Sequence, residues 1–261
     1  MGLKITELLV GNYMTAYPIS VKPDVPFKTV VNFMADRGFA TLIVMEEENP
    51  MPLGVLTERE ILHHVVSGEK MYQPVKETFI QSFVSVTPAT PVIKAAKLMI
   101  STKSRLLVFA DKIKLGGIVT ASDMLRAFRK TDTAPSLEKV ISTKIYQCSY
   151  EDSVLDAARI LHEKKIGSVI VTRDSTFGIF TQRDLVKILE REIELGKKVG
   201  EYASFPLVTA KKGILANEAA SIMAAKNIKR LALATNGLLA GIVIAHDIVD
   251  AFQMEFTSGL E

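Results

Sequence analysis

The chain is built from one sequence pattern that occurs four times. Each copy has a glycine, two apolar residues, a threonine or isoleucine, two further residues and an acid. The four glycines, Gly54, Gly117, Gly178 and Gly241, follow one another at intervals of 63, 61 and 63 residues. Regular internal repeats indicate an array of one supersecondary unit, because a single unit cannot bury its own apolar face. We therefore expect four similar structural units.

The apolar periodicity changes in the same order within every repeat. A short extended segment is followed by a helical pattern such as 154–163, with Asp152 or Ser153 as its N-cap. An apolar run, a turn, the glycine segment and a second helix such as 183–189 follow. The turn of the fourth repeat contains Asn236-Gly237, which is a strong hairpin signal. The order predicts βαββα repeats in a mixed α/β (α+β) fold. The extended segments are 19–21, 84–86, 146–148 and 207–209, and the apolar runs are 41–44, 106–109, 168–171 and 231–234.

A repeat of 61 to 63 residues, the interval between the glycines, buries too little surface to be stable alone. We therefore expect the first repeat to pair with the second and the third with the fourth, as two pseudo-twofold pairs. The boundary between the pairs is placed in the polar segment 129–136, which contains a proline. The predicted domains are 1–66, 67–130, 137–191 and 192–261, and residues 254–261 are expected to form a frayed tail.

The composition excludes several classes of protein. Hydrophobic residues make up 48% of the 261 residues, so the chain can form a core and is not generally disordered. Cys148 is the single cysteine, which excludes a disulfide framework and predicts a core thiol in a reducing compartment. The longest apolar run, 238–245, is too short to cross a membrane, and the N-terminus lacks a signal-peptide pattern. With a net charge of +3 spread evenly, we expect a cytoplasmic protein with neither a membrane nor a nucleic-acid partner.

The Thr-x-x-acid motif at the start of each second helix has two interpretations. In a capping box, the threonine and an acid three residues later satisfy free backbone N–H groups, and Thr57 with Glu60 fits this fully. The shorter Asp123 and Asp184 fit a capping box less well. Alternatively, the helix N-terminus and the threonine bind a phosphate while the aspartate accepts both hydroxyls of a ribose. The residues by themselves leave both interpretations open.

The period, the order of the elements and the Gly-apolar-apolar-Thr-x-x-Asp signature resemble the cystathionine-β-synthase (CBS) domain family. The resemblance covers residues 8–253, and four copies are similar to two tandem pairs, known as Bateman modules. It implies a regulatory protein that binds adenosine-containing ligands (AMP, ADP, ATP or S-adenosylmethionine) in clefts between paired repeats. Ligand binding is then expected to reorient the repeats and to signal to a separate effector protein.

The residues that the resemblance implies are unevenly present in the four repeats. The second and third repeats have complete Thr–Asp pairs, whereas Glu60 replaces the aspartate in the first repeat and Ile244 replaces the threonine before Asp247. Basic residues before the apolar run are implied to reach the phosphates, and hydroxyls of the first segment to meet adenine and ribose. The implied ligand-binding residues are Thr120, Asp123, Thr181, Asp184, Asp247, Arg105, Arg230, Arg183, Ser20, Ser85 and Thr209, with Arg59 as a further candidate.

Two functional hypotheses stand side by side. The first is a non-enzymatic nucleotide sensor, and the second is a ligand-free oligomerisation or docking scaffold in which the motifs only cap helices. We expect no enzyme activity, because the motifs assemble no nucleophile–base pair, and no cofactor apart from the regulatory nucleotide. We also expect no metal site, because His63, His64, His162 and His246 lack ligand spacing. The modules are expected to stack within one chain or to form a homo-oligomer.

Overall fold

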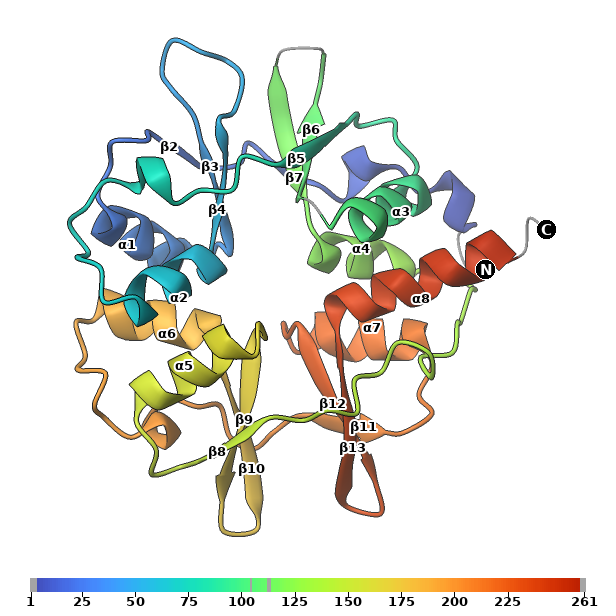
Figure 1. Cartoon of the computed structure of the whole chain (residues 1–261). Coiled ribbons are helices and arrows are strands. Elements are labelled where there is room, and N and C mark those ends of the chain that lie inside the picture. The colour runs from blue at the N-terminus through green and yellow to red at the C-terminus, as the bar shows by residue number, and fades with distance from the viewer. Residues whose placement is uncertain (1–3, 104, 112–113, 259–261) are drawn as a thin grey trace. The chain divides into compact units, whose positions relative to one another are not determined.

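The computed structural model describes residues 4–103, 105–111 and 114–258, and it confirms the four βαββα repeats (Figure 1). The first repeat contains β2 Ser20–Val21, α1 Phe27–Arg37, β3 Thr41–Val44, β4 Gly54–Thr57 and α2 Glu58–Val66. The second contains β5 Phe83–Val86, α3 Val92–Thr102, β6 Arg105–Phe109, β7 Leu115–Val119 and α4 Ala121–Phe128. The third contains β8 Gln147–Ser149, α5 Val154–Glu163, β9 Ser168–Arg173, β10 Thr176–Thr181 and α6 Gln182–Glu190. The fourth contains β11 Thr209–Lys211, α7 Ala216–Ala225, β12 Arg230–Thr235, β13 Leu238–Ile244 and α8 Ala245–Ser258.

Short elements lie between and before the repeats. They are β1 Thr15–Ala16 and the 3-10 helices η1 Ile5–Glu7, η2 Val10–Asn12, η3 Val75–Glu77 and η4 Val199–Glu201. None of the helices in the described ranges combines the length and hydropathy needed to cross a membrane.

Each repeat forms a small sheet around its second strand. The first strand runs parallel to the second, and the second pairs with the glycine strand in an antiparallel hairpin. The first helix is the crossover that a parallel pair of strands requires. In the fourth repeat the hairpin turns at Asn236 and Gly237, whose φ angles of 51° and 79° suit a type I′ turn. The hairpin predicted from Asn-Gly is therefore confirmed.

The segment that leads into each repeat pairs with the glycine strand of a different repeat. The pairs are β1 with β7, Ile80 with Val55, Ser142 with Ile242, and Ser204 with Ile179. The repeated glycines lie at these crossings: a Cβ on Gly178 would lie 2.6 Å from the Phe205 ring, and one on Gly117 would lie 2.7 Å from Sδ of Met14. The glycine therefore makes room for the passing chain. The pairing of repeats one with two and three with four stays a prediction.

The described residues pack into two compact units. Unit 1 contains the second and fourth repeats with the N-terminal segment (4–18, 82–144 and 208–258), and unit 2 contains the first and third repeats (19–81 and 145–207). Within each unit the four helices lie between the two sheets (Figure 1). Unit 1 stacks Phe128 of α4 on Phe252 of α8, with the ring centroids 4.2 Å apart. The helix faces that bury apolar side chains therefore join repeats that are not consecutive in the sequence.

The third repeat shows why the helical periodicity was readable in the sequence. The buried residues of α5 are Val154, Ala157, Ala158 and Leu161, whose spacing of three and four puts them on one face. The helix has the predicted bounds. Of the two predicted N-caps it is Ser153 that caps α5, since its Oγ accepts the Asp156 N–H at 3.0 Å.

The C-terminal segment is more ordered than expected, and the predicted linker packs against a core. The frayed-tail prediction is wrong for residues 254–258, because α8 continues to Ser258 and Phe256 packs against the core of unit 1. Residues 259–261 lie outside the described residues. In the predicted linker 129–136, Thr131 is buried and its hydroxyl donates to the Phe128 carbonyl at 2.9 Å. This segment therefore packs as part of unit 1.

Candidate functional site

The motif threonine and its acid form a capping box at the start of the second helix in three repeats. At α6, the backbone N–H and the hydroxyl of Thr181 both donate to Oδ2 of Asp184, at 2.9 and 2.7 Å. The equivalent bonds are 2.7 and 2.9 Å between Thr120 and Asp123, and 2.8 and 2.6 Å between Thr57 and Glu60. Asp123 and Asp184 were expected to fit a capping box less well than Glu60, but they accept the same two bonds from their threonines. The extended backbone of the N-cap brings its N–H close enough for the shorter acid to reach.

The caps leave different oxygens available in the two complete motifs. In Asp123 both oxygens are engaged, because Oδ1 accepts from the guanidinium of Arg126 at 2.8 Å. Arg126 also donates to the Tyr13 carbonyl at 2.6 Å, which holds it in place. In Asp184 only Oδ2 is hydrogen-bonded to the described residues. Asp184 can therefore accept a ligand hydroxyl through Oδ1 without breaking an existing bond, whereas Asp123 cannot.

Burial makes these carboxyl groups harder to ionise. Desolvation raises the pKa of Asp123 and of Asp184 above the ordinary value, and the hydrogen bonds from the threonines act in the opposite direction. The effect is larger in the fourth repeat, where burial raises the pKa of Asp247 from 3.8 to about 6. The neighbouring Asp250 raises that pKa further, and the bond from the Ile244 N–H opposes the rise. Perturbed carboxyl groups of this kind are common in functional sites.

The start of α8 retains half of the capping box. Asp247 Oδ2 accepts the backbone N–H of Ile244 at 2.8 Å, whereas the isoleucine side chain has no hydroxyl to add. Arg230 is the first residue of β12, and its Cα is paired with that of Ile244 in the hairpin. The structure therefore places Arg230 beside the position where the other repeats carry the motif threonine.

Arg105 holds the corresponding place in the second repeat, as the first residue of β6. It lies close enough to His246 of α8 to affect its titration: burial lowers the pKa of His246, and the Arg105 charge lowers it further. Asp250 acts in the opposite direction. Unit 1 thus brings Arg105 and His246, from two repeats, together near Asp247.

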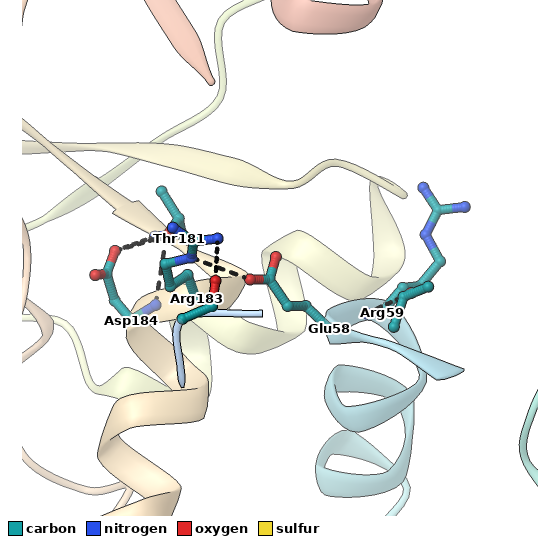
Figure 2. A network of polar contacts seen from close by, with 7 residues as sticks. Glu58, Arg59, Thr181, Arg183 and Asp184 are labelled. Carbon is teal, nitrogen blue, oxygen red and sulfur yellow. Dashed lines mark hydrogen bonds and ion pairs between the residues drawn. The ribbon is translucent and has the colours of Figure 1, made fainter. Parts of the chain in front are cut away.

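The motif arginines of unit 2 do not point at their own Thr–acid pairs. Figure 2 shows Arg183 directed toward Glu58 of α2, with Asp184 on its other side. Nε of Arg183 lies 3.3 Å from Oε1 of Glu58, and its Nη2 donates to the Gly38 carbonyl at 3.1 Å. Arg59 makes the reciprocal contact with the Lys165 carbonyl at 3.5 Å. Each motif arginine therefore links its helix start to the turn before the second strand of the other repeat.

The predicted hydroxyl residues lie apart from the motif of their own repeat. Ser20, Ser85 and Thr209 are exposed on β2, β5 and β11. In each sheet the central strand separates them from the glycine strand, a distance of roughly 10 Å across two strand spacings. They are not brought next to Asp123, Asp247 or Glu60 within their own sheets.

Several residues of these networks were missed in the sequence. Glu58 and Arg126 look like ordinary charged residues of a helix, and the Gly38 carbonyl has no side-chain signal at all. Glu58 did have one local cue, because it directly follows a motif threonine. Cys148 is buried as predicted, and burial raises the pKa of its thiol to about 12. In the described part of the chain no group of three or more potential metal ligands occurs.

The chain belongs to the CBS domain family. The family model matches four segments, residues 10–67, 75–130, 137–191 and 199–253. These segments coincide closely with the four repeats described above.

Two similar proteins come from Methanocaldococcus jannaschii and Thermofilum pendens. The uncharacterized protein MJ1404 of Methanocaldococcus jannaschii is 22% identical over 260 residues, covering 92% of this chain and 61% of its own length. An uncharacterized 33.4 kDa protein of Thermofilum pendens is 25% identical over 63% of this chain and 59% of its own length. The chain thus spans about three fifths of the length of these curated relatives.

Two crystal structures have similar folds. MJ1225 of Methanocaldococcus jannaschii, proposed to be an archaeal homologue of g-AMPK, superimposes with a TM-score of 0.80 at 19% identity, over 94% of this chain and all of that one. An uncharacterized conserved protein of Pyrococcus horikoshii gives 0.66 at 20% identity, over 93% of this chain and 99% of that one. At these identities the likeness shows a common four-repeat fold.

Proposed function

We propose that this protein is a non-enzymatic regulatory sensor that binds adenosine-containing ligands, with the start of α6 as its principal site. The Oδ1 of the half-buried Asp184, which no described residue hydrogen-bonds, carries this proposal. A carboxylate with one oxygen held by the cap and the other available can accept a ribose hydroxyl without losing its position. The N-terminus of α6 and the Thr181 hydroxyl add the donors that a phosphate requires.

The other motifs form a graded set. The Thr120–Asp123 site requires that Arg126 share or release Asp123 Oδ1, so we expect weaker binding there. The fourth repeat has no hydroxyl at Ile244 but does have Arg230 beside it, which suits a phosphate better than a ribose. In the first repeat Glu60 accepts the two capping bonds from Thr57, but it replaces the aspartate that would hold a ribose. AMP, ADP, ATP and S-adenosylmethionine all carry the shared ribose, and the basic groups favour the phosphorylated ones.

Arg183 supplies a route from ligand to conformational change. It directly precedes Asp184 and is bonded to Glu58 and to the Gly38 carbonyl of the first repeat. A phosphate at the start of α6 would compete with these two acceptors for the guanidinium. A ligand that binds better when Arg183 is released shifts the packing of the two repeats by that difference in affinity. The resemblance of the fold to the proposed g-AMPK homologue supports this nucleotide-sensing role, and the regulated partner would be a separate protein.

Calorimetry on protein freed of carried-over ligand tests the site. We expect at least one of AMP, ADP, ATP and S-adenosylmethionine to bind, and Asp184→Asn to weaken its affinity roughly 10- to 100-fold, the range for a hydrogen bond to a charged group. The asparagine oxygen still accepts from Thr181, so the cap is retained. Asp156→Asn is the matched control: the Asp156 carboxylate accepts the Ser153 hydroxyl at the start of α5 of the same repeat but is not in the motif.

The coupling requires a second readout. Amide exchange of residues 38–41 is expected to change when the ligand binds, and Arg183→Ala is expected to remove that change. The competing hypothesis, a scaffold with capping motifs, is favoured by the bonds from threonine to acid at three helix starts. It predicts no heat with any of the four ligands, and that result would reject the proposed sensor.

A further inference from the structure

Two histidines from different repeats of unit 2 meet on the protein surface. Nδ1 of His63 in α2 and Nε2 of His162 in α5 are 3.0 Å apart, although the residues are 99 positions apart in the sequence. The ring centroids are 5.2 Å apart and the planes differ by 21°, so the two nitrogens face each other almost edge to edge. His63 is exposed and His162 is half-buried, so solvent reaches the pair.

The fold itself does not require this pair. Counted from the repeated glycine, His63 of α2 corresponds to Lys187 of α6. Counted from the left-handed residue that follows the first helix of each repeat, Gly38 or Lys165, His162 of α5 corresponds to Ala35 of α1. The packing of α1 on α6 is thus the pseudo-symmetric counterpart of α2 on α5, and there a lysine and an alanine suffice. The two imidazoles are therefore an addition at one of two equivalent places.

We propose that His63 and His162 bind a divalent transition-metal ion such as Zn²⁺, with water completing the coordination. Imidazole nitrogen is a preferred ligand for Zn²⁺, at about 2.0–2.1 Å, so two nitrogens on one tetrahedral ion lie roughly 3.3 Å apart. The observed 3.0 Å needs only a small rotation of each ring to direct both lone pairs at one ion. The ring protons are then carried by Nε2 of His63 and Nδ1 of His162.

The surroundings set the strength of such a site. Arg59 lies four residues before His63 in α2, and Arg159 lies three residues before His162 in α5. Arg159 is paired with Asp156 at 3.4 Å. These positive charges and the absence of a third protein ligand within the described residues predict weaker binding than in a structural zinc site. Because the two ligands come from α2 and α5, the ion would join the first repeat to the third.

Zinc binding is tested by calorimetry and thermal unfolding of the full chain without a histidine tag. At pH 7.5 and a Zn²⁺ concentration tenfold above the dissociation constant, we expect the unfolding midpoint to rise by roughly 3 °C. Mg²⁺, which prefers oxygen ligands, should have no effect. At pH 5.5 the Zn²⁺ affinity should fall, because the ligands must be neutral.

The double variant His63→Lys/His162→Ala copies the residues of the equivalent position, so its packing is one this fold already contains. We expect it to fold and to lose at least tenfold in Zn²⁺ affinity, while His246→Gln in unit 1 retains the wild-type affinity. Zn²⁺ binding that is absent in the wild type, or unchanged in the double variant, would overturn the proposal. Neither outcome depends on nucleotide binding.

Discussion

The carboxyl group of Asp247 is predicted to lower the stability of the folded chain at neutral pH. Desolvation, with a contribution from Asp250, raises its pKa from 3.8 to about 6 in the folded protein. A raised pKa means that the folded state binds the proton more tightly than the unfolded state does. Ionisation of Asp247 therefore destabilises the fold, with no cost below pH ~4, a growing cost up to pH ~6, and a constant cost above it.

The magnitude follows from the shift. About two pKa units correspond to about 3 kcal/mol, and partial exposure of the side chain reduces this to about 2 kcal/mol. Asp247→Asn removes the charge, and its amide oxygen can still accept the Ile244 N–H. We therefore expect the variant to be about 2 kcal/mol more stable than wild type at pH 7.5, with the difference approaching zero near pH 4.

Urea unfolding of both proteins between pH 4.5 and pH 7.5 measures this difference. A carboxyl ¹³C titration of Asp247 gives the folded pKa directly. If the variant is less stable at pH 7.5, or if the difference does not grow with pH, the assigned burial of the charge is wrong. A confirmed cost would indicate that Asp247 is retained for binding and not for stability.

Three further predictions concern the cap, the thiol and the repeated glycine. Thr181→Ala loses the hydroxyl bond to Asp184, and urea unfolding should show a loss of about 1 kcal/mol. Cys148, whose pKa burial raises to about 12, should not react with a thiol reagent at pH 8 until denaturant is added; rapid reaction in native protein would contradict the burial. Gly178→Ala places a methyl group 2.6 Å from the Phe205 ring and should cost about 1–3 kcal/mol, whereas Gly196→Ala, with no atom within 4 Å, should be nearly neutral.

Much of the architecture could be predicted because its signals are local. The spacing of Val154, Ala157, Ala158 and Leu161 is a property of consecutive turns, and Asn236-Gly237 specifies its own hairpin. The motif Thr181 and Asp184 are three residues apart, so their contact was also predictable. What the motif could not show is that Asp184 has a free oxygen while Asp123 does not. That difference depends on Arg126, which the Tyr13 carbonyl holds from a remote part of the chain.

The sequence alone determined the four repeats, the βαββα order within each and the positions of the helix starts, since all of these arise from neighbouring residues. The tertiary structure decided which repeats share a core and which polar groups meet. Lys28 of α1 donates to the Leu189 carbonyl at the end of α6, 161 residues away, and Arg183 reaches the Gly38 carbonyl across 145 residues. The acceptors in these bonds are backbone carbonyls, which every residue has, so no residue type marks them. They become specific partners only when burial of the apolar helix faces brings the two repeats together.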